Sequence, residues 1–464
     1  MPKMCIICRG RAGSREHIFP AALGGRRVNK GIYCGEHNQG FGPLASILSY
    51  QLTPLNALLG VRPDHDDQPR QLTATNPSDG QTYLVSATNV ELASPKVLND
   101  TTVEGARHVA VQFANEHQIQ EWLTEQRAAG FKVEIQKREE GRGYFARPYK
   151  VELALGKLEG LRAIGYIALT FLAHYFPPVA RQPELKPFKD FALGASGEQP
   201  VWWDFTAPPD DIPPNSFRFG HRILIGLSAA RQEAYARVSL FSTLDFAVHF
   251  GAVRVASSQT VIVDIDPQAD RAPGDISEVR EQKALTGIDR PESLTSSLRD
   301  TIESGNARLR FERLLQKISD WHRECVAKDL LPKVDAIKSL DAHERIQQVK
   351  HLLSDHGQSV FNLMLFVARR CKEQFGADPA TAALVPAVDI LVAEAPESAT
   401  GISQTAACTL ELATTALSHQ ICRDHDDGKL NWERLSLLLG GESGAEIVKK
   451  VMLQPLMMAL RIIQ

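Results

Sequence analysis

The stretch that decides the fold of this chain lies at its start. It reads Cys5-Ile-Ile-Cys8 and then, after a polar segment rich in arginine, Cys34-Gly-Glu-His37. Two ligand pairs with this spacing are typical of a tetrahedral zinc site, because each short turn presents both of its ligands to one side of the ion. We therefore expect a structural Zn²⁺ bound by Cys5, Cys8, Cys34 and His37. The alternative, a chance pairing of buried cysteines, is disfavoured by the polar surroundings.

The segment between the two pairs carries residues that a purely structural zinc finger does not need. They are Glu16-His17-Ile18-Phe19-Pro20, the pair Gly24-Gly25, Asn29 ahead of Cys34, and Asn38-Gln39-Gly40-Phe41-Gly42 directly after His37. In this combination, about the first 45 residues resemble the HNH (ββα-metal) endonucleases. The resemblance implies a β-hairpin followed by a helix, and an enzyme that hydrolyses the phosphodiester bonds of DNA.

The resemblance also implies a role for each matching residue. His17 matches the general base that deprotonates the attacking water, a task suited to imidazole because it changes charge near neutral pH. Glu16 matches the acidic ligand of the catalytic metal ion, and Asn29 matches the residue that braces the hairpin loop and helps hold the base. Asn38 falls where the family most often has a histidine ligand of that ion.

Asn38 therefore departs from the family pattern. Its neutral carbonyl oxygen suits a hard ion better than a soft one, so we expect a weakly held Mg²⁺ or Mn²⁺ as catalytic cofactor. His37 could instead bind this ion and leave the zinc with three ligands, but the Cys34-x-x-His37 spacing favours the zinc role. The expected reaction is in-line hydrolysis assisted by one metal ion.

The charge distribution is uneven along the chain. With 52 Lys+Arg against 55 Asp+Glu, the formal net charge of −3 excludes a histone-like polycation. Residues 1–40 nevertheless carry seven basic and two acidic side chains, a net charge of +5, so the remaining residues total −8. A basic patch beside such a site is typical of phosphate-backbone binding, although a solvated surface is the alternative. The expected DNA contacts are Arg15, Arg26, Arg27 and Lys30.

The composition is that of an ordinary globular protein, with 43% apolar and 23% charged residues in 464. Seven cysteines are too few for a disulfide scaffold of this length, which favours a reducing, cytoplasmic location. The longest apolar run, residues 164–176, includes His174 and is too short to cross a bilayer, so no membrane contact is expected.

Local patterns predict an α+β fold in four parts. These are the zinc-stabilised ββα-metal module at 1–45, a mixed α/β scaffold or recognition region with antiparallel strands at 46–266, a linker at 267–291, and an all-helical domain at 292–464. Helical spacing of apolar residues predicts helices at 44–59 and about 155–176. Alternating or β-branched residues predict an antiparallel meander of strands at 223–227, 234–241, 246–255 and 260–265. The loop Asp64-His65-Asp66-Asp67 is interpreted as a solvated turn. Met452, Met457 and Met458 around Pro455 indicate a kinked core helix or a surface for self-association or a protein partner.

Two functions follow from these observations. The first is a regulated HNH endonuclease acting on DNA, by analogy with prokaryotic antiviral defence nucleases, because a small nuclease attached to a large body suggests controlled cutting. The second is a non-catalytic, zinc-stabilised nucleic-acid-binding or interaction protein in which Asn38 marks a lost metal site. Convergence of Glu16, Asn38 and His17 on one open site would favour the enzyme, whereas a Glu16 that points away would favour the binding protein.

Overall fold

The computed structural model describes residues 3–64, 69, 71–76, 80–87, 89–103, 105–140, 143–144, 155–206, 212–269, 276–283, 296–379, 381–395 and 401–463. The chain forms two compact units, each assembled from separate segments. The first contains Met1–Thr73, Leu84–Val90 and Val151–Gln316, and the second contains Ala74–Tyr83, Glu91–Lys150 and Lys317–Gln464. The boundaries expected at residues 45 and 266 lie inside the first unit. The expected α+β class, with antiparallel sheets and a helical C-terminal region, is confirmed.

The N-terminal part of the first unit is a small hairpin followed by a long helix. Strands β1 (Glu16–His17) and β2 (Val28–Asn29) pair antiparallel, and the 3₁₀ turn η1 (Ala21–Leu23) lies in the loop between them. Helix α1 (Gly35–Leu59) starts directly after Cys34, which is its N-cap. The expectation from apolar spacing placed this helix at residues 44–59, and its polar first turns carried no such signal.

A six-stranded antiparallel sheet forms the centre of the first unit. Its strand order is β13-β12-β9-β10-β11-β8. The expected meander is only partly confirmed. Strands β9, β10 and β11 are consecutive neighbours, but β12 pairs with β9 and not with β11. Part of the segment 267–291, expected to be a linker, forms β13, whereas residues 270–275 and 284–291 lie outside the described residues. The strands are β8 (Val201–Trp203), β9 (His221–Ser228), β10 (Glu233–Leu240), β11 (Leu244–Ala252), β12 (Gln259–Ile265) and β13 (Ile276–Glu281).

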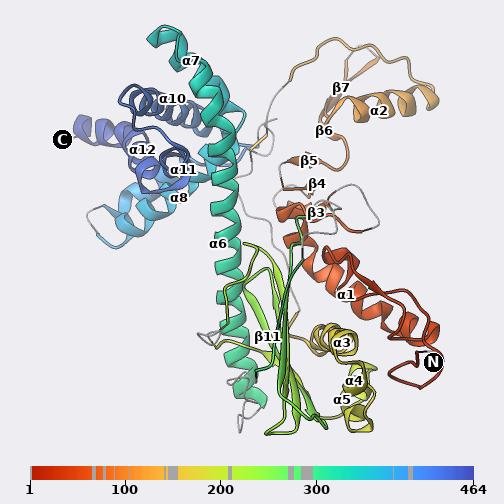
Figure 1. The fold of residues 1–464 in the computed structure, drawn as a ribbon. Helices are drawn as coiled ribbons and strands as arrows, with labels where there is room; N and C mark the ends of the chain where they lie inside the picture. The colour runs from red at the N-terminus through yellow and green to blue at the C-terminus, as the bar shows by residue number, and fades with distance from the viewer. Residues whose placement is uncertain are drawn as a thin grey trace. The chain divides into compact units, whose positions relative to one another are not determined.

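Helix α3 (Leu158–Tyr175) packs against this sheet and against α1, and it is buried along almost its whole length. It corresponds to the core helix expected at residues 155–176. Figure 1 shows α3 on one side of the strands, with the short helices α4 (Pro177–Ala180) and α5 (Lys186–Ala192) beside it. The turn η2 (Pro183–Leu185) precedes α5. Each of these elements has a proline in its first turn, where proline suits a helix start because its missing N–H would be unpaired anyway.

Short strands lie between the two long segments of the first unit. The strands β3 (Leu72–Thr75), β4 (Thr82–Val85) and β5 (Val90–Leu92) form a three-stranded sheet. In the second unit, β6 (Lys96–Val103) and β7 (Ala106–Gln112) form an antiparallel hairpin. Helix α2 (Glu116–Ala128) follows, and the Asn115 side chain caps it by accepting a hydrogen bond from the Gln118 backbone N–H.

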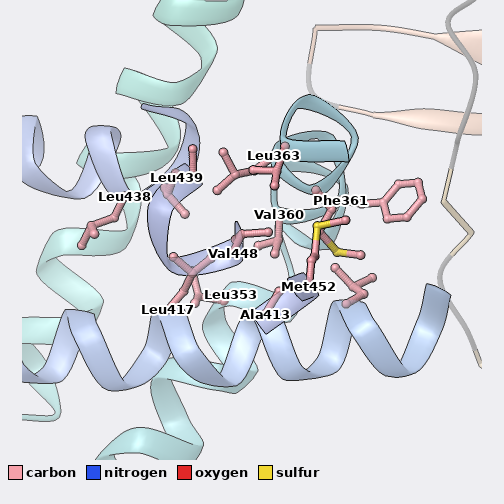
Figure 2. Close-up of a cluster of buried hydrophobic side chains, with 14 of the residues drawn as sticks. Leu353, Val360, Phe361, Leu363, Ala413, Leu417, Leu438, Leu439, Val448 and Met452 are labelled. Carbon is pink, nitrogen blue, oxygen red and sulfur yellow. The ribbon is translucent and has the colours of Figure 1, made fainter. Parts of the chain in front are cut away.

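The C-terminal region is helical and encloses its own apolar core. Figure 2 shows side chains from α7, α8, α10, α11 and α12 meeting in this core, among them Leu353, Phe361, Leu417 and Val448. Met452 is buried there, whereas the side chains of Pro455, Met457 and Met458 lie outside the described residues. The elements are α6 (Ser296–Ala336), α7 (Ala342–Ser354), α8 (Gly357–Gly376), η3 (Ala382–Leu384), α9 (Val385–Ile390), α10 (Gln404–Asp426), α11 (Trp432–Gly440) and α12 (Glu442–Ile463).

In the described part of the chain, none of the helices combines the length and the apolar character that a membrane span requires.

Candidate metal centre and nuclease site

The four expected zinc ligands lie together. The ligand atoms of Cys5, Cys8, Cys34 and His37 are all within 4.8 Å of one another. The Cys8 and Cys34 sulfurs are 3.8 Å apart, and the Cys34 sulfur is 3.1 Å from His37 Nδ1. Zinc–sulfur bonds of about 2.3 Å at tetrahedral angles place two sulfurs roughly 3.8 Å apart. The cluster therefore has the ligand types and the spacing to bind a metal ion such as structural zinc.

Local backbone structure explains why these residues converge. After Cys5 the chain makes a tight turn in which Arg9 adopts a left-handed conformation (φ 61°) and the Cys5 N–H donates to Gly10 O at 2.7 Å. The Gly10 N–H then points at the Cys8 sulfur, 3.4 Å away. Burial opposes ionisation of Cys5, but backbone N–H groups, those of Cys8 and Ile7 foremost, hold the pKa of its thiol below the usual value. Such hydrogen bonds favour the thiolate that a metal requires.

The loop of the hairpin is closely packed. Its 3₁₀ turn ends at Gly24, whose φ of 88° favours glycine. At the next residue, a Cβ on Gly25 would lie 2.0 Å from the carbonyl oxygen of Phe19. The pair Gly24-Gly25 is thus required by the backbone path that returns the chain from β1 to β2.

His17, the expected general base, faces an acidic residue that the sequence interpretation passed over. Its Nε2 lies 2.9 Å from Asp64 Oδ2, and Arg26 Nη1 donates to Asp64 Oδ1 at 3.2 Å. The pKa of Asp64 is lowered, first by the hydrogen bond with His17 and further by Arg26. Asp64 is therefore a carboxylate at neutral pH, and it links the candidate base to an arginine.

Glu16 points to a different place from His17, as successive residues of a strand do. Its side chain is 7% exposed and accepts a short hydrogen bond from the Tyr166 hydroxyl of α3. Burial raises the pKa of Glu16 to about 7, against which the Tyr166 hydrogen bond acts only in part. The two residues that the sequence pairs as base and metal ligand are thus held by separate sets of contacts.

Asn38 has an unusual environment for a polar residue in the first turns of a helix. Its Oδ1 is buried and has no hydrogen-bond partner among the described residues. Phe41, three residues further along α1, shares that helical face, and its ring centroid is 4.9 Å from that of Tyr166. Tyr166 is also the hydrogen-bond partner of Glu16. A buried orphan acceptor and a desolvated carboxylate are the kind of oxygen donors that a hard cation accepts.

Asn29 braces the chain after β2. Its Oδ1 accepts a hydrogen bond from the Gly31 N–H at 2.8 Å, which lies after β2 and outside the loop between the two strands. Its Nδ2 lies 2.8 Å from His174 Nδ1 on α3, not against His17. Burial, helped by the nearby Arg27 charge, lowers the pKa of His174 to about 4. His174 is neutral at pH 7, and its Nδ1 can accept from the amide.

The four basic residues expected to contact DNA differ in their surroundings. Arg15 and Lys30 are exposed on the hairpin. Arg27 is also exposed, but Nη1 donates to Tyr175 Oη at 2.9 Å and to Glu278 Oε2 at 3.1 Å. Arg26 is only 18% exposed and is occupied by Asp64 and by the carbonyl oxygen of Arg62. Arg15 and Lys30 are thus the more accessible pair.

Sequence reasoning missed Asp64, Tyr166 and Glu278. Tyr166 carried a weak signal, because it is a polar-tipped residue inside an otherwise apolar helix. Asp64 was assigned to a solvated turn together with residues 65–67, which lie outside the described residues. Neither Asp64 nor Glu278 lies near the hairpin in sequence, so only the fold could reveal their contacts.

Comparison of the chain with protein-family models, with curated proteins and with solved structures finds no match.

Proposed function

We propose that the N-terminal hairpin and helix form a metal-dependent HNH endonuclease module that hydrolyses DNA phosphodiester bonds. The observation that carries the proposal is the combination of β1, β2 and α1 with the cluster of Cys5, Cys8, Cys34 and His37. This order of elements is the one that the HNH resemblance implies. His17 lies on the first strand, beside a carboxylate that can support a base.

The proposed chemistry is hydrolysis by an activated water. A ring nitrogen of His17 takes a proton from the water as the water oxygen bonds to phosphorus. The bond from phosphorus to the leaving oxygen breaks on the opposite side, and that oxygen takes a proton from solvent. Glu16 and Asn38 would hold Mg²⁺ or Mn²⁺, which would neutralise charge on the phosphate.

DNA is the proposed substrate because the basic head carries a net charge of +5 in residues 1–40. Exposed Arg15, Arg27 and Lys30 would contact phosphates without reading sequence. Binding of this kind releases counterions and weakens as salt rises. Regulated cutting in prokaryotic antiviral defence is proposed as the setting, by analogy and from the large remainder of the chain. None of the seven cysteines, all within the described residues, forms a disulfide, which suits a reducing cytoplasm.

The helical C-terminal region is the proposed place for self-association or a protein partner. It encloses its own apolar core. Leu412 of α10 and Leu437 of α11 remain exposed beside that core. Regulation through this region would keep the nuclease inactive until a partner or second copy binds.

A second candidate is a non-catalytic, zinc-stabilised protein that binds nucleic acid or another protein. Two specific contacts favour it. Glu16 is hydrogen-bonded to Tyr166 inside the protein, and His17 Nε2 is occupied by Asp64. In this alternative both contacts serve only to join the hairpin to α3 and to the segment after α1.

Incubation of the full chain with supercoiled plasmid and Mg²⁺ or Mn²⁺ separates the two candidates. The nuclease predicts nicked or linear product from the wild type and about 10²-fold less, or still lower, cutting by His17→Ala. His108→Ala is a matched control, since His108 is exposed on β7 in the other unit. DNA retention without cutting by all three proteins would support the binding protein, and equal cutting by all three would exclude His17 as the base.

A further inference from the structure

The contact between His17 and Asp64 is built by a dedicated turn of the chain. Helix α1 ends where Gly60 adopts a left-handed conformation (φ 66°) and donates to carbonyl groups of the last helical turn. Val61 is fully buried, and its N–H donates to Asn56 O at 2.9 Å. The chain then returns toward the hairpin that precedes the helix.

Two contacts with the hairpin loop fix the position of this returning segment. The Asp64 N–H donates to Ala21 O at 3.3 Å, and Arg26 Nη2 donates to Arg62 O at 3.2 Å. The Asn56 side chain adds a third link from α1 itself, donating from Nδ2 to Ala22 O at 3.3 Å. The Asp64 carboxylate therefore meets His17 through an ordered backbone and not through a chance surface contact.

Both oxygens of Asp64 are used, and each partner is partly shielded from water. Oδ2 faces His17 Nε2, and Oδ1 accepts from Arg26 Nη1. The side chains of His17 and Arg26 are each 18% exposed, and that of Asp64 is 25% exposed. An arginine on the second oxygen fixes the rotation of the carboxylate, so that its other oxygen is aimed at the imidazole.

We propose that Asp64 is the positioning residue of His17, holding the imidazole as its Nε2–H tautomer for the nuclease reaction; this rests on the proposed function. Donation of the Nε2 proton to Asp64 fixes the orientation and the tautomer of the ring, which takes the proton of the attacking water. The ring then carries a positive charge, and the Asp64 carboxylate stabilises it without taking a proton. Arg26 acts through Asp64 and contacts no substrate.

The test uses single-turnover cleavage of a short DNA duplex by the full chain in Mn²⁺. Asp64→Asn is expected to lower the cleavage rate constant by about 10²-fold or more, because the amide no longer fixes the tautomer or stabilises the cation. The dissociation constant for DNA is expected to change less than about twofold, since Asp64 touches no phosphate. Asp64→Glu is expected to recover part of the lost rate.

Asp100→Asn is the matched control, because Asp100 also pairs with an arginine, Arg107, but lies in the other unit. It is expected to cut like the wild type. Zinc content and thermal unfolding of each variant identify any that fail to fold. Should Asp64→Asn fail to fold, the comparison of Asp64→Glu with wild type and the spectra of the wild type decide the question.

A spectroscopic measurement tests the pairing without any need for cleavage. Ring ¹⁵N chemical shifts of His17 at neutral pH are expected to report Nε2–H in the wild type and a mixture of tautomers in Asp64→Asn. A wild-type ring protonated on Nδ1 would overturn the proposal, as would cleavage by Asp64→Asn at or above the wild-type rate. If His17→Ala is inactive but Asp64→Asn is not, only this inference fails. If the wild type does not cut, the proposed function fails, while the spectra still decide the pairing.

Discussion

His221 is a completely buried titratable side chain, at 0% exposure. It lies at the start of β9 between the rings of Phe19 and Phe241, with centroids 4.8 Å and 4.6 Å away. Burial lowers the pKa of His221 to about 3. The neutral ring is thus part of the core that joins the hairpin loop to the sheet.

The depressed pKa of His221 predicts a specific pH dependence of stability. Because the unfolded state binds the proton more readily, His221 contributes stability above about pH 6.5, and this contribution is lost as pH falls toward 3. Between pH 7 and pH 5 the loss is about 2 kcal/mol. Urea unfolding is expected to show a smaller loss for His221→Gln than for the wild type and the exposed-site control His108→Gln. Equal losses in all three would contradict the assignment.

At the scale of single residues, the sequence identified the metal ligands but not the partners of the base. Ligand spacing in Cys5-x-x-Cys8 and Cys34-x-x-His37 is a local property, so it could be read directly. The contact of His17 with Asp64 depends on where α1 ends and how the chain turns back. The Tyr166 hydroxyl reaches Glu16 only because α3 packs against the hairpin. No local pattern encodes such packing.

The loop of the hairpin leaves no space for a side chain at Gly25. Gly25→Ala would push a methyl group against the Phe19 carbonyl, and we expect it to lower the free energy of unfolding by about 1–3 kcal/mol. Gly13→Ala is the control, since a Cβ there meets nothing within 4 Å, and its effect should stay within about 0.5 kcal/mol. Thermal unfolding of both variants provides the comparison. Equal stability of the two would show that the loop rearranges freely.

The folded state of the turn that carries Cys5 and Cys8 is expected to depend on bound zinc. Cys8→Ser removes one of four ligands, so we expect loss of bound zinc and rapid proteolysis of the head, whereas the helical core of the second unit stays resistant. Cys408→Ser replaces an exposed cysteine outside the cluster and should keep a single zinc ion per chain. Metal analysis and limited proteolysis measure these outcomes. Purified wild-type protein that contains no zinc would contradict the assignment of this cluster as a zinc site.

The sequence predicts those helices and strands that have an apolar face. The sheet strands and the core helix match their predicted positions within a few residues, because alternation and helical spacing reflect burial. The first turns of α1 were not predictable in this way, since Glu36, Gln39 and Gly40 are exposed and polar. Helix α1 nevertheless begins at Gly35, directly after Cys34.

At the scale of the whole molecule, the charge of the head predicts salt-dependent DNA binding. Each phosphate that a lysine or arginine neutralises adds about one to the magnitude of the slope of log affinity against log salt concentration. Lys30→Ala is expected to reduce the slope by about this amount, whereas Lys132→Ala, an exposed lysine of the second unit, should leave it unchanged. Fluorescence anisotropy over a range of salt concentrations measures both. Identical slopes for both variants and the wild type would remove Lys30 from the interface.

The division into two units could not be read from the sequence. Residues 1–73 and 151–316 belong to one unit, although the segment between them belongs mainly to the other. Composition and periodicity report on neighbours along the chain, whereas this division arises from contacts between distant segments. It matters for the site, because α3 and β13 supply Tyr166, His174 and Glu278 to the surroundings of the hairpin.

The most direct test of the central claim is the cleavage rate of duplex DNA by wild type and His17→Ala in the presence of Mg²⁺ or Mn²⁺. The account predicts metal-dependent cutting by the wild type, a loss of about 10²-fold or more in His17→Ala with zinc retained, and wild-type cutting by His108→Ala. Cutting by zinc-loaded His17→Ala at the wild-type rate, or no cutting by the wild type with either ion, would contradict it.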